Sequence, residues 1–285
     1  MSSADLTIGG LTLHLEGGDG VAAAMSLPGM RTFIGENGSA PRLTLLLDAK
    51  VPEAEGNERH SFEICDGREM CRFVAGNDGA WYYTFGPGER LRIAPTRPYM
   101  AQCTPIVNLD KLRFALWLAY GMMAMHHGRM PVHSSAVVCD GRAVMCLGES
   151  GTGKSTHTRL WTSTIEGCHL LNDDSPILAA TADGAMLYGS PWSGKTHCYR
   201  QEAYPVAALL RLQQRKKNSI RRLKTIEAFA ALQPSCPPSL AHDSRTTDIM
   251  IDFVGKIIST TPVYLMGCLP NAEAAIMSHN TIYGN

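Results

Sequence analysis

Residues 148–155, which read Gly-Glu-Ser-Gly-Thr-Gly-Lys-Ser, restrict the possible folds of this chain more than any other segment. The apolar run 142–147 before them predicts a buried strand, and residues 156–161 after them predict the first turns of a helix. A strand, a glycine-rich loop and a helix in this order form a phosphate-binding loop. Glycines let successive backbone N–H groups face an anion, and the helix N-terminus adds partial positive charge.

We expect this loop to bind the phosphates of a nucleotide. The residues expected to surround the phosphates are Gly148, Glu149, Ser150, Gly151, Thr152, Gly153, Lys154, Ser155 and Thr156. Lys154 would reach the β- and γ-phosphates, and the Ser155 hydroxyl would bind Mg²⁺. A chance glycine-rich turn is the alternative, and the strand and helix around the motif argue against it.

Composition limits the classes of protein to which the chain can belong. Of its 285 residues, 45% are hydrophobic and 18% are charged, and the formal net charge is zero. This is the balance of a globular protein with one large domain, or one domain and a smaller companion. A duplex-binding protein would usually show a broader basic face than the clusters 215–217 and 221–222, so we expect no nucleic-acid partner. The apolar stretch 112–125 is interrupted by Arg113 and too short to span a membrane.

Nine cysteines are scattered along the chain. None belongs to a Cys-x-x-Cys motif, and no cysteine–histidine spacing suggests a zinc site. The odd number of cysteines, together with an N-terminus that lacks a basic and apolar signal segment, predicts a reducing compartment and a cytoplasmic protein.

Residues 1–105 predict a β-rich N-terminal region. A hairpin pattern surrounds Gly9-Gly10, and short apolar runs then alternate with turn signals, which is typical of an antiparallel meander. The polar residues 49–60 predict a loop. No chemically reactive residues gather in this region, so we expect it to serve as a scaffold, a substrate cover or a surface for homo-oligomer assembly.

Residues 106–285 predict an α/β (α+β) domain with a mixed sheet, built around the phosphate-binding loop. Asn108 is a suitable N-cap and Gly128 a suitable stop for a helix between them. The strand 131–139 and the tight turn Asp140-Gly141 then make an antiparallel hairpin whose second strand enters the loop. Doubly wound proteins alternate strand and helix instead, so this hairpin narrows the choice of fold.

Asp173 and Asp174 follow the next predicted strand, 167–171, and offer the carboxylates that phosphoryl transfer needs. One carboxylate at a strand end can hold Mg²⁺, and its neighbour can accept the proton of an attacking hydroxyl. An acidic turn before Pro176 is the alternative, but the position one helix after the loop favours a functional role. His133, early in the predicted strand 132–138, could lie near the phosphates, although a histidine at a strand start is often structural.

These segments together resemble the catalytic domain of HPr kinase/phosphorylase. The resemblance rests on Val132-His133-Ser-Ser-Ala, the turn Asp140-Gly141, the loop 148–155 and the pair Asp173-Asp174, and it covers roughly residues 107–200. More loosely, the chain is similar to ATP-dependent phosphoenolpyruvate carboxykinase, whose nucleotide fold that kinase resembles.

The resemblance implies Mg-ATP as the cofactor and a role for each of these side chains. Lys154 would contact phosphate, and His133 would lie near the transferred phosphoryl group. Asp174 would be the base, and Asp173 would join Ser155 on the metal. From the sequence alone, the two aspartates could also exchange these roles.

Residues 187–196 depart from that family. The kinase has a metal-binding acid where this chain reads Leu-Tyr-Gly-Ser-Pro-Trp. The kinase's late arginine-containing signature has no clear copy here, and Arg200 and Arg245 are only candidates to replace it. The chain instead reads Gly-Ser-Pro-Trp-Ser-Gly-Lys-Thr, which resembles a group of HPr-kinase-like proteins of bacteria. Ser193, Lys195 and Arg200 are therefore candidates for contacting a substrate, and a structural loop that packs Trp192 is the alternative.

The sequence therefore predicts an ATP- and Mg²⁺-dependent kinase that transfers the γ-phosphoryl group to a hydroxyl, on a protein serine or on a small molecule. Lys154, His133, Asp173 and Asp174 would form its catalytic centre. Two other functions stay open at this point. One is a carboxykinase-like lyase, which would need further arginines and a metal-binding histidine, and the other is a catalytically silent nucleotide-binding sensor or assembly subunit.

Overall fold

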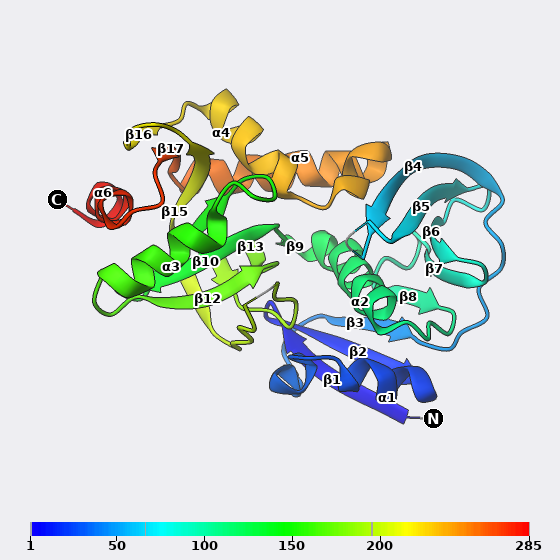
Figure 1. Cartoon of the computed structure of the whole chain (residues 1–285). Coiled ribbons are helices and arrows are strands. Elements are labelled where there is room, and N and C mark those ends of the chain that lie inside the picture. The colour runs from blue at the N-terminus through cyan, green and yellow to red at the C-terminus, as the bar shows by residue number, and fades with distance from the viewer. Residues whose placement is uncertain (1, 66, 195, 285) are drawn as a thin grey trace. The chain divides into compact units, whose positions relative to one another are not determined.

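The computed structural model describes residues 2–65, 67–194 and 196–284, and the chain forms two compact units (Figure 1). Unit 1 comprises Met1–Arg129 and Ser239–Ile249, and unit 2 comprises Met130–Pro238 and Met250–Asn285. The sequence pattern predicts a boundary between residues 105 and 106, whereas the first part of unit 1 continues to Arg129. The helix α2 (Leu109–Ala124), which follows the predicted boundary, packs on α1 and on three strands of unit 1.

Unit 1 is built on a sheet whose described strands run in the order β1-β2-β3-β8-β7-β6-β5-β4. Their bounds are β1 (Ser2–Ile8), β2 (Leu11–Gly17), β3 (Arg42–Leu46), β4 (Gly56–Ile64), β5 (Glu69–Gly76), β6 (Trp81–Gly86), β7 (Glu89–Ile93) and β8 (Met100–Cys103). The hairpin at Gly9-Gly10 is present, with φ angles of 57° and 76° at the two glycines. Strands β4 to β8 form the expected antiparallel meander.

Two features of unit 1 differ from the sequence prediction. β3 pairs in parallel with both β2 and β8, so the sheet is mixed rather than antiparallel. Parallel neighbours need a crossover, and the segment between β2 and β3 supplies it with α1 (Asp19–Ser26) and the short helix η1 (Met30–Phe33). The predicted loop 49–60 is also wrong in its second half, because β4 begins at Gly56. β4 is an edge strand whose charged side chains face solvent, and such a strand lacks the apolar alternation that would reveal it.

The helix α2 begins and ends where the sequence predicts. The Asn108 side chain accepts hydrogen bonds from the backbone N–H groups of Asp110 (2.9 Å) and Lys111 (3.1 Å). The helix continues into a short 3₁₀ turn, η2 (Met125–His127), which stops at Gly128 in the left-handed region.

The segment 239–249 returns to unit 1 from far along the chain. The His242 ring stacks on His60 of β4, with ring centroids 3.8 Å apart. The Arg245 guanidinium lies over the Trp81 ring and donates a hydrogen bond to the Gly79 carbonyl (2.9 Å). These contacts fix the segment on the face of the meander.

Unit 2 is a mixed α/β unit whose main sheet path is β12-β10-β11-β15-β14-β13-β9. β17 pairs with β15, and β16 pairs with β17. The strands are β9 (Arg129–Pro131), β10 (Ser134–Cys139), β11 (Arg142–Leu147), β12 (His169–Asp174), β13 (Ile177–Thr181), β14 (Gly184–Tyr188), β15 (Ala203–Gln214), β16 (Ser219–Arg222) and β17 (Val263–Cys268). The helices are α3 (Lys154–Thr164), α4 (Thr225–Leu232), α5 (Ser244–Thr260), which enters from unit 1, and α6 (Ala272–Tyr283), with the short turns η3 (Gln233–Ser235) and η4 (Pro238–His242) between α4 and α5.

The hydrophobic core beside the glycine-rich loop 148–153 lies between this sheet and the packed pair α3 and α6 (Figure 1). Trp161 of α3 is fully buried there, and its indole N–H donates to the Ser278 hydroxyl of α6 (2.9 Å). The neighbouring His157 ring lies 3.0 Å from the same hydroxyl. A buried hydrogen-bond network thus holds the two helices in one register.

A disulfide joins Cys139 at the end of β10 to Cys168, 29 residues later. Neither residue belongs to a spacing motif, so the pairing could not be predicted from the sequence. Within the described residues, each helix is too short or too polar to cross a lipid bilayer.

Candidate functional site

The glycine-rich loop lies between β11 and α3, in the strand–loop–helix order that its sequence predicts. β11 ends at Leu147, and Lys154 opens α3 after Gly153, whose φ is 102°. Gly148 and Gly151 also have positive φ, and a side chain at Gly148 would meet Thr152 directly. The glycines therefore permit a backbone path that few other residues allow, and the first N–H groups of α3 face the loop opening.

Lys154 folds back over this loop. Its Nζ donates to the carbonyls of Gly148 (2.9 Å) and Glu149 (3.1 Å) and lies 3.0 Å from His133 Nε2. Burial lowers the pKa of Lys154, against the opposing effect of the nearby Asp174 and Asp173 carboxylates. The ammonium is thus held at the loop in a partly desolvated place, where its charge would act on an anion more strongly than in water.

His133 reaches Lys154 because the strand predicted at 131–139 is broken. β9 ends at Pro131 and β10 begins at Ser134, and the His133 backbone N–H donates to the Ser235 carbonyl (2.8 Å) instead of to the sheet. The break leaves the imidazole half exposed, with Nδ1 at 3.2 Å from Asp174 Oδ1. Asp174, His133 and Lys154 form a continuous polar chain.

Asp173 and Asp174 are the last residues of β12, which pairs antiparallel with β10. Asp173 lies opposite Ser135, whose hydroxyl is 2.8 Å from the Thr158 hydroxyl of α3. Asp173 is buried, whereas the Asp174 side chain is 30% exposed. The hairpin and the register of β12 therefore bring both carboxylates to the loop end of the sheet, one covered and one open to solvent.

Asn172, immediately before Asp173 and Asp174, holds the second glycine-bearing loop, which begins at Gly189, against these two aspartates. Its Nδ2 donates to the Ser190 and Trp192 carbonyls, both at 3.3 Å, and its Oδ1 accepts from the Asp174 N–H (3.1 Å). The sequence prediction did not name Asn172. An asparagine directly before an acidic pair was the available signal, since a buried amide can satisfy several loop groups at once.

The second loop packs on the aspartates through Gly194. Its N–H donates to the Asp173 carbonyl (2.8 Å), and a Cβ at this position would lie 2.7 Å from the same oxygen. Ser193 is buried, and its hydroxyl donates to the Thr196 carbonyl (2.6 Å), so it helps to hold the loop. Lys195, the other expected substrate contact in this loop, lies outside the described residues.

The two arginines suggested as family substitutes have acidic partners. Arg200 pairs with Glu202, with Nη1 at 3.1 Å from Oε1. Arg245 pairs with Asp243 inside unit 1. A substrate contact by Arg200 stays a prediction, and it would compete with this ion pair.

Arg211 of β15 is a candidate that the sequence prediction missed. It lies opposite Leu147 in the parallel β11–β15 pair, directly beside the start of the loop. Its Nη2 is 3.8 Å from Glu149 Oε1, and its side chain is 18% exposed. A single arginine in the apolar run 207–212 was the available signal, because a charge is seldom placed in a core strand without a partner or a task.

A cavity of about 420 Å³ adjoins the loop and the first turns of α3. Residues from three elements line it, among them Gly153, Thr156, Leu160, Gln214, Leu269 and Pro270. Gln214 also donates to the Gly151 carbonyl (3.1 Å), which ties the end of β15 to the loop. The cavity has apolar walls next to the backbone amides that suit an anion.

The fold and the site define a mixed α/β protein with a glycine-rich loop, between a strand and a helix, beside an acidic strand end. Comparison with protein-family models found no match, and comparison with curated protein sequences found none either. Among solved structures, an HPr(Ser) kinase/phosphatase from Coxiella burnetii is similar over 53% of this chain and 96% of its own, at 12% identity and a TM-score of 0.32. At that TM-score no residue role is carried across, so the roles proposed below rest on the contacts of this chain.

Proposed function

We propose that this protein is an ATP- and Mg²⁺-dependent phosphotransferase that moves the γ-phosphoryl group to a hydroxyl, on a protein serine or on a small molecule. The observation that carries the proposal is the chain Asp174–His133–Lys154 at the mouth of the glycine-rich loop. It combines, at one point, a carboxylate that can take a proton and a cation that can hold a phosphate.

The nucleotide would be bound by the loop and by the cavity beside it. The backbone N–H groups of residues 148–156 suit the phosphates, and the Lys154 ammonium adds a full positive charge. The cavity with Leu160 and Pro270 in its wall suits the flat, largely apolar face of a nucleoside base.

Ser155 and Asp173 are the residues that would hold Mg²⁺. Magnesium prefers hard oxygen ligands, and both side chains offer them. The strand register supports this pairing, because Asp173 lies opposite Ser135 and the Ser135 hydroxyl contacts Thr158, one turn along α3 from Ser155. When bound, the ion would neutralise charge on the phosphate oxygens.

Asp174 suits the role of the base better than Asp173. Its carboxylate is open to solvent, so an acceptor hydroxyl can approach it, whereas Asp173 is buried. His133, with Nδ1 at 3.2 Å from Asp174 Oδ1, would orient the carboxylate. The proton of the acceptor hydroxyl would pass to Asp174 as the oxygen attacks the γ-phosphorus.

The test is transfer of label from γ-labelled ATP to a metabolite and peptide library, with wild-type protein and with Asp174→Asn. We expect Asp174→Asn to bind ATP with a Kd within about threefold of wild type and to lower transfer by about 10²–10⁴-fold. Asp183→Asn, in the exposed β13–β14 turn, is the matched control and should leave both unchanged. Wild-type protein that binds ATP but neither hydrolyses nor transfers it with any acceptor would exclude the kinase and favour a nucleotide sensor.

A further inference from the structure

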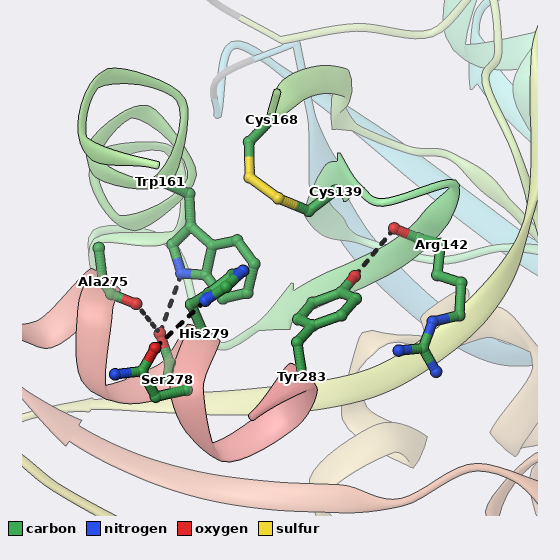
Figure 2. Close-up of a disulfide and its surroundings, with 9 residues drawn as sticks. Cys139, Arg142, Trp161, Cys168, Ala275, Ser278, His279 and Tyr283 are labelled. Carbon is green, nitrogen blue, oxygen red and sulfur yellow. Dashed lines mark hydrogen bonds between the residues drawn. A yellow bond between two sulfur atoms is a disulfide. The ribbon is translucent and has the colours of Figure 1, made fainter. Parts of the chain in front are cut away.

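Four side chains that can ligate a metal lie at one end of the β10–β12 strand pair, the end away from Asp173 and Asp174. Cys139 ends β10, and Cys168 lies just before β12, next to the cross-strand pair Val138–His169. Their Cα atoms are 4.4 Å apart and their sulfurs are bonded (Figure 2). The proposed catalytic residues lie at the other end of the same two strands, so this cluster is separate from them.

Asp140 and His279 complete the cluster. Asp140 opens the β10–β11 turn with a φ of 48°, and His279 projects from α6. The ligand atoms of Cys139, Asp140 and His279 all lie within 4.8 Å of one another. With Cys168 bonded to Cys139, the set is two sulfurs, one carboxylate and one imidazole.

His279 is held in place by contacts on both sides of it in α6. Before it, the Ser278 hydroxyl accepts from the Trp161 indole (2.9 Å) and donates to the Ala275 carbonyl (3.0 Å) (Figure 2). After it, the Tyr283 hydroxyl donates to the Arg142 carbonyl in β11 (3.0 Å), and the Tyr283 ring stacks on His279. The hydrogen bonds thus hold the part of α6 that carries His279, and the stacked Tyr283 ring restricts the plane of its imidazole.

We propose that these four residues form a zinc-class metal site that exists only when the Cys139–Cys168 disulfide is reduced. Two thiolates, an imidazole and a carboxylate suit a tetrahedral Zn²⁺ ion. The ion needs two sulfurs about 3.8 Å apart, as follows from Zn–S bonds of about 2.3 Å, so the bonded pair cannot bind it.

A dithiol can convert the disulfide form into the reduced form that binds the metal. The dithiol gives two electrons and two protons to the S–S bond and becomes a disulfide itself, leaving two cysteine thiols. Zn²⁺ then binds both sulfurs and releases the two protons. Oxidation reverses the sequence and expels the ion. The site is independent of the proposed phosphotransferase activity.

The experiment uses the full chain, reduced with a dithiol, stripped of metal and desalted without oxygen. Zn²⁺ is titrated against a chromogenic chelator, and Co²⁺ replaces it for absorption spectra. We expect one tightly bound ion per chain, with thiolate-to-cobalt charge transfer and the visible bands of tetrahedral cobalt. After oxidation with a disulfide oxidant, the ion and the bands should be lost.

Variants identify the ligands. His279→Gln should weaken zinc binding by more than about tenfold, since loss of even a supporting partner of a ligand has that effect. The matched controls are His169→Gln, beside Cys168 but paired with Glu202, and Cys268→Ser, a partly exposed free thiol. Both should bind zinc like wild type.

Three results would overturn the proposal. They are no stoichiometric zinc in the reduced protein, equal binding before and after oxidation, and a loss of binding in a control that equals the loss in His279→Gln. The comparison of oxidised and reduced wild type needs no substitution, so a variant that fails to fold leaves the proposal testable.

Discussion

The Nζ of Lys154 lies 3.0 Å from the Nε2 of His133, 21 residues earlier in the chain. An ammonium has only hydrogens to donate, so Nε2 must be the unprotonated nitrogen in this contact. The proton of a neutral ring is then on Nδ1, which faces Asp174. The contact therefore sets the tautomer of His133 and aligns it between a cation and a carboxylate.

Replacing Lys154 should reveal the charge that it brings to the loop. Because burial lowers the pKa of Lys154, its ammonium should lose a proton at a pH below the ordinary lysine pKa of about 10.4. Turnover should therefore fall as the pH rises through this lowered pKa. Lys154→Arg should be slower but keep its rate through this range, since arginine stays charged. The measurement is the pH–rate profile of ATP turnover, and equal alkaline limbs in the two proteins would contradict the assignment.

Arg211 should matter for the rate more than for nucleotide binding. Its place beside Glu149 lets the guanidinium reach charge that develops on the transferred group, so Arg211→Gln should lower kcat by about 10²-fold and change the ATP Kd by less than about tenfold. Arg222→Gln, on the exposed β16, is the control. A kcat unchanged in Arg211→Gln would leave that arginine a purely structural role.

Gly194→Ala should displace Asp173 and Asp174, because the loop at Gly194 packs directly against Asp173. The added methyl would lie 2.7 Å from the Asp173 carbonyl, and relieving that contact should cost about 1–3 kcal/mol and lower turnover at least tenfold. Gly255→Ala, in α5 with open space around its Cβ, should instead stabilise the protein by roughly 0.5–1 kcal/mol. Thermal unfolding and ATP turnover measured on both variants give the comparison, and a Gly194→Ala protein as active as wild type would rule out tight packing there.

His157 should make stability depend on pH in mildly acidic solution. Burial lowers its pKa from 6.5 to about 4, so between these values the unfolded chain binds a proton that the folded chain does not. Stability should therefore rise with pH across this window, and about 3 kcal/mol should be lost once the pH falls below 4. Protonation would also turn Nε2, which accepts from the Trp161 indole at 3.2 Å, into a donor.

Urea unfolding of wild type and of His157→Gln at several pH values from 7 to 4 measures this effect. We expect the variant to show a smaller slope than wild type, whereas a variant of the exposed His197 should keep the wild-type slope. A wild-type stability that does not change across the window would show that the histidine is not buried in its neutral form.

Local signals predicted the elements around the loop because their physics is local. The N-cap at Asn108, the turn at Asp140-Gly141 and the glycines of 148–153 each impose a backbone conformation within a few residues. The contact of His133 with Lys154 was also within reach of sequence, since one hairpin and one loop connect them.

The features that could not be predicted from the sequence depend on pairing between segments that are far apart in the chain. The parallel pairing of β3, the β11–β15 register that places Arg211, and the fit of Gly194 under Asp173 all join segments that local propensity does not relate. The Cys139–Cys168 pair is of the same kind, because only the antiparallel register of β10 and β12 makes the two residues neighbours.

The return of residues 239–249 to unit 1 has a consequence for the order in which the chain can mature on the ribosome. Trp81 and His60 leave the ribosome early, but Arg245 and His242, which cover them, follow only after residues 130–238 have been made. At synthesis rates of about 5–20 residues per second, the meander, which ends at Cys103, waits roughly 7–30 s for Arg245. Unit 2 is in turn interrupted by that segment, so neither unit is complete before translation has passed it.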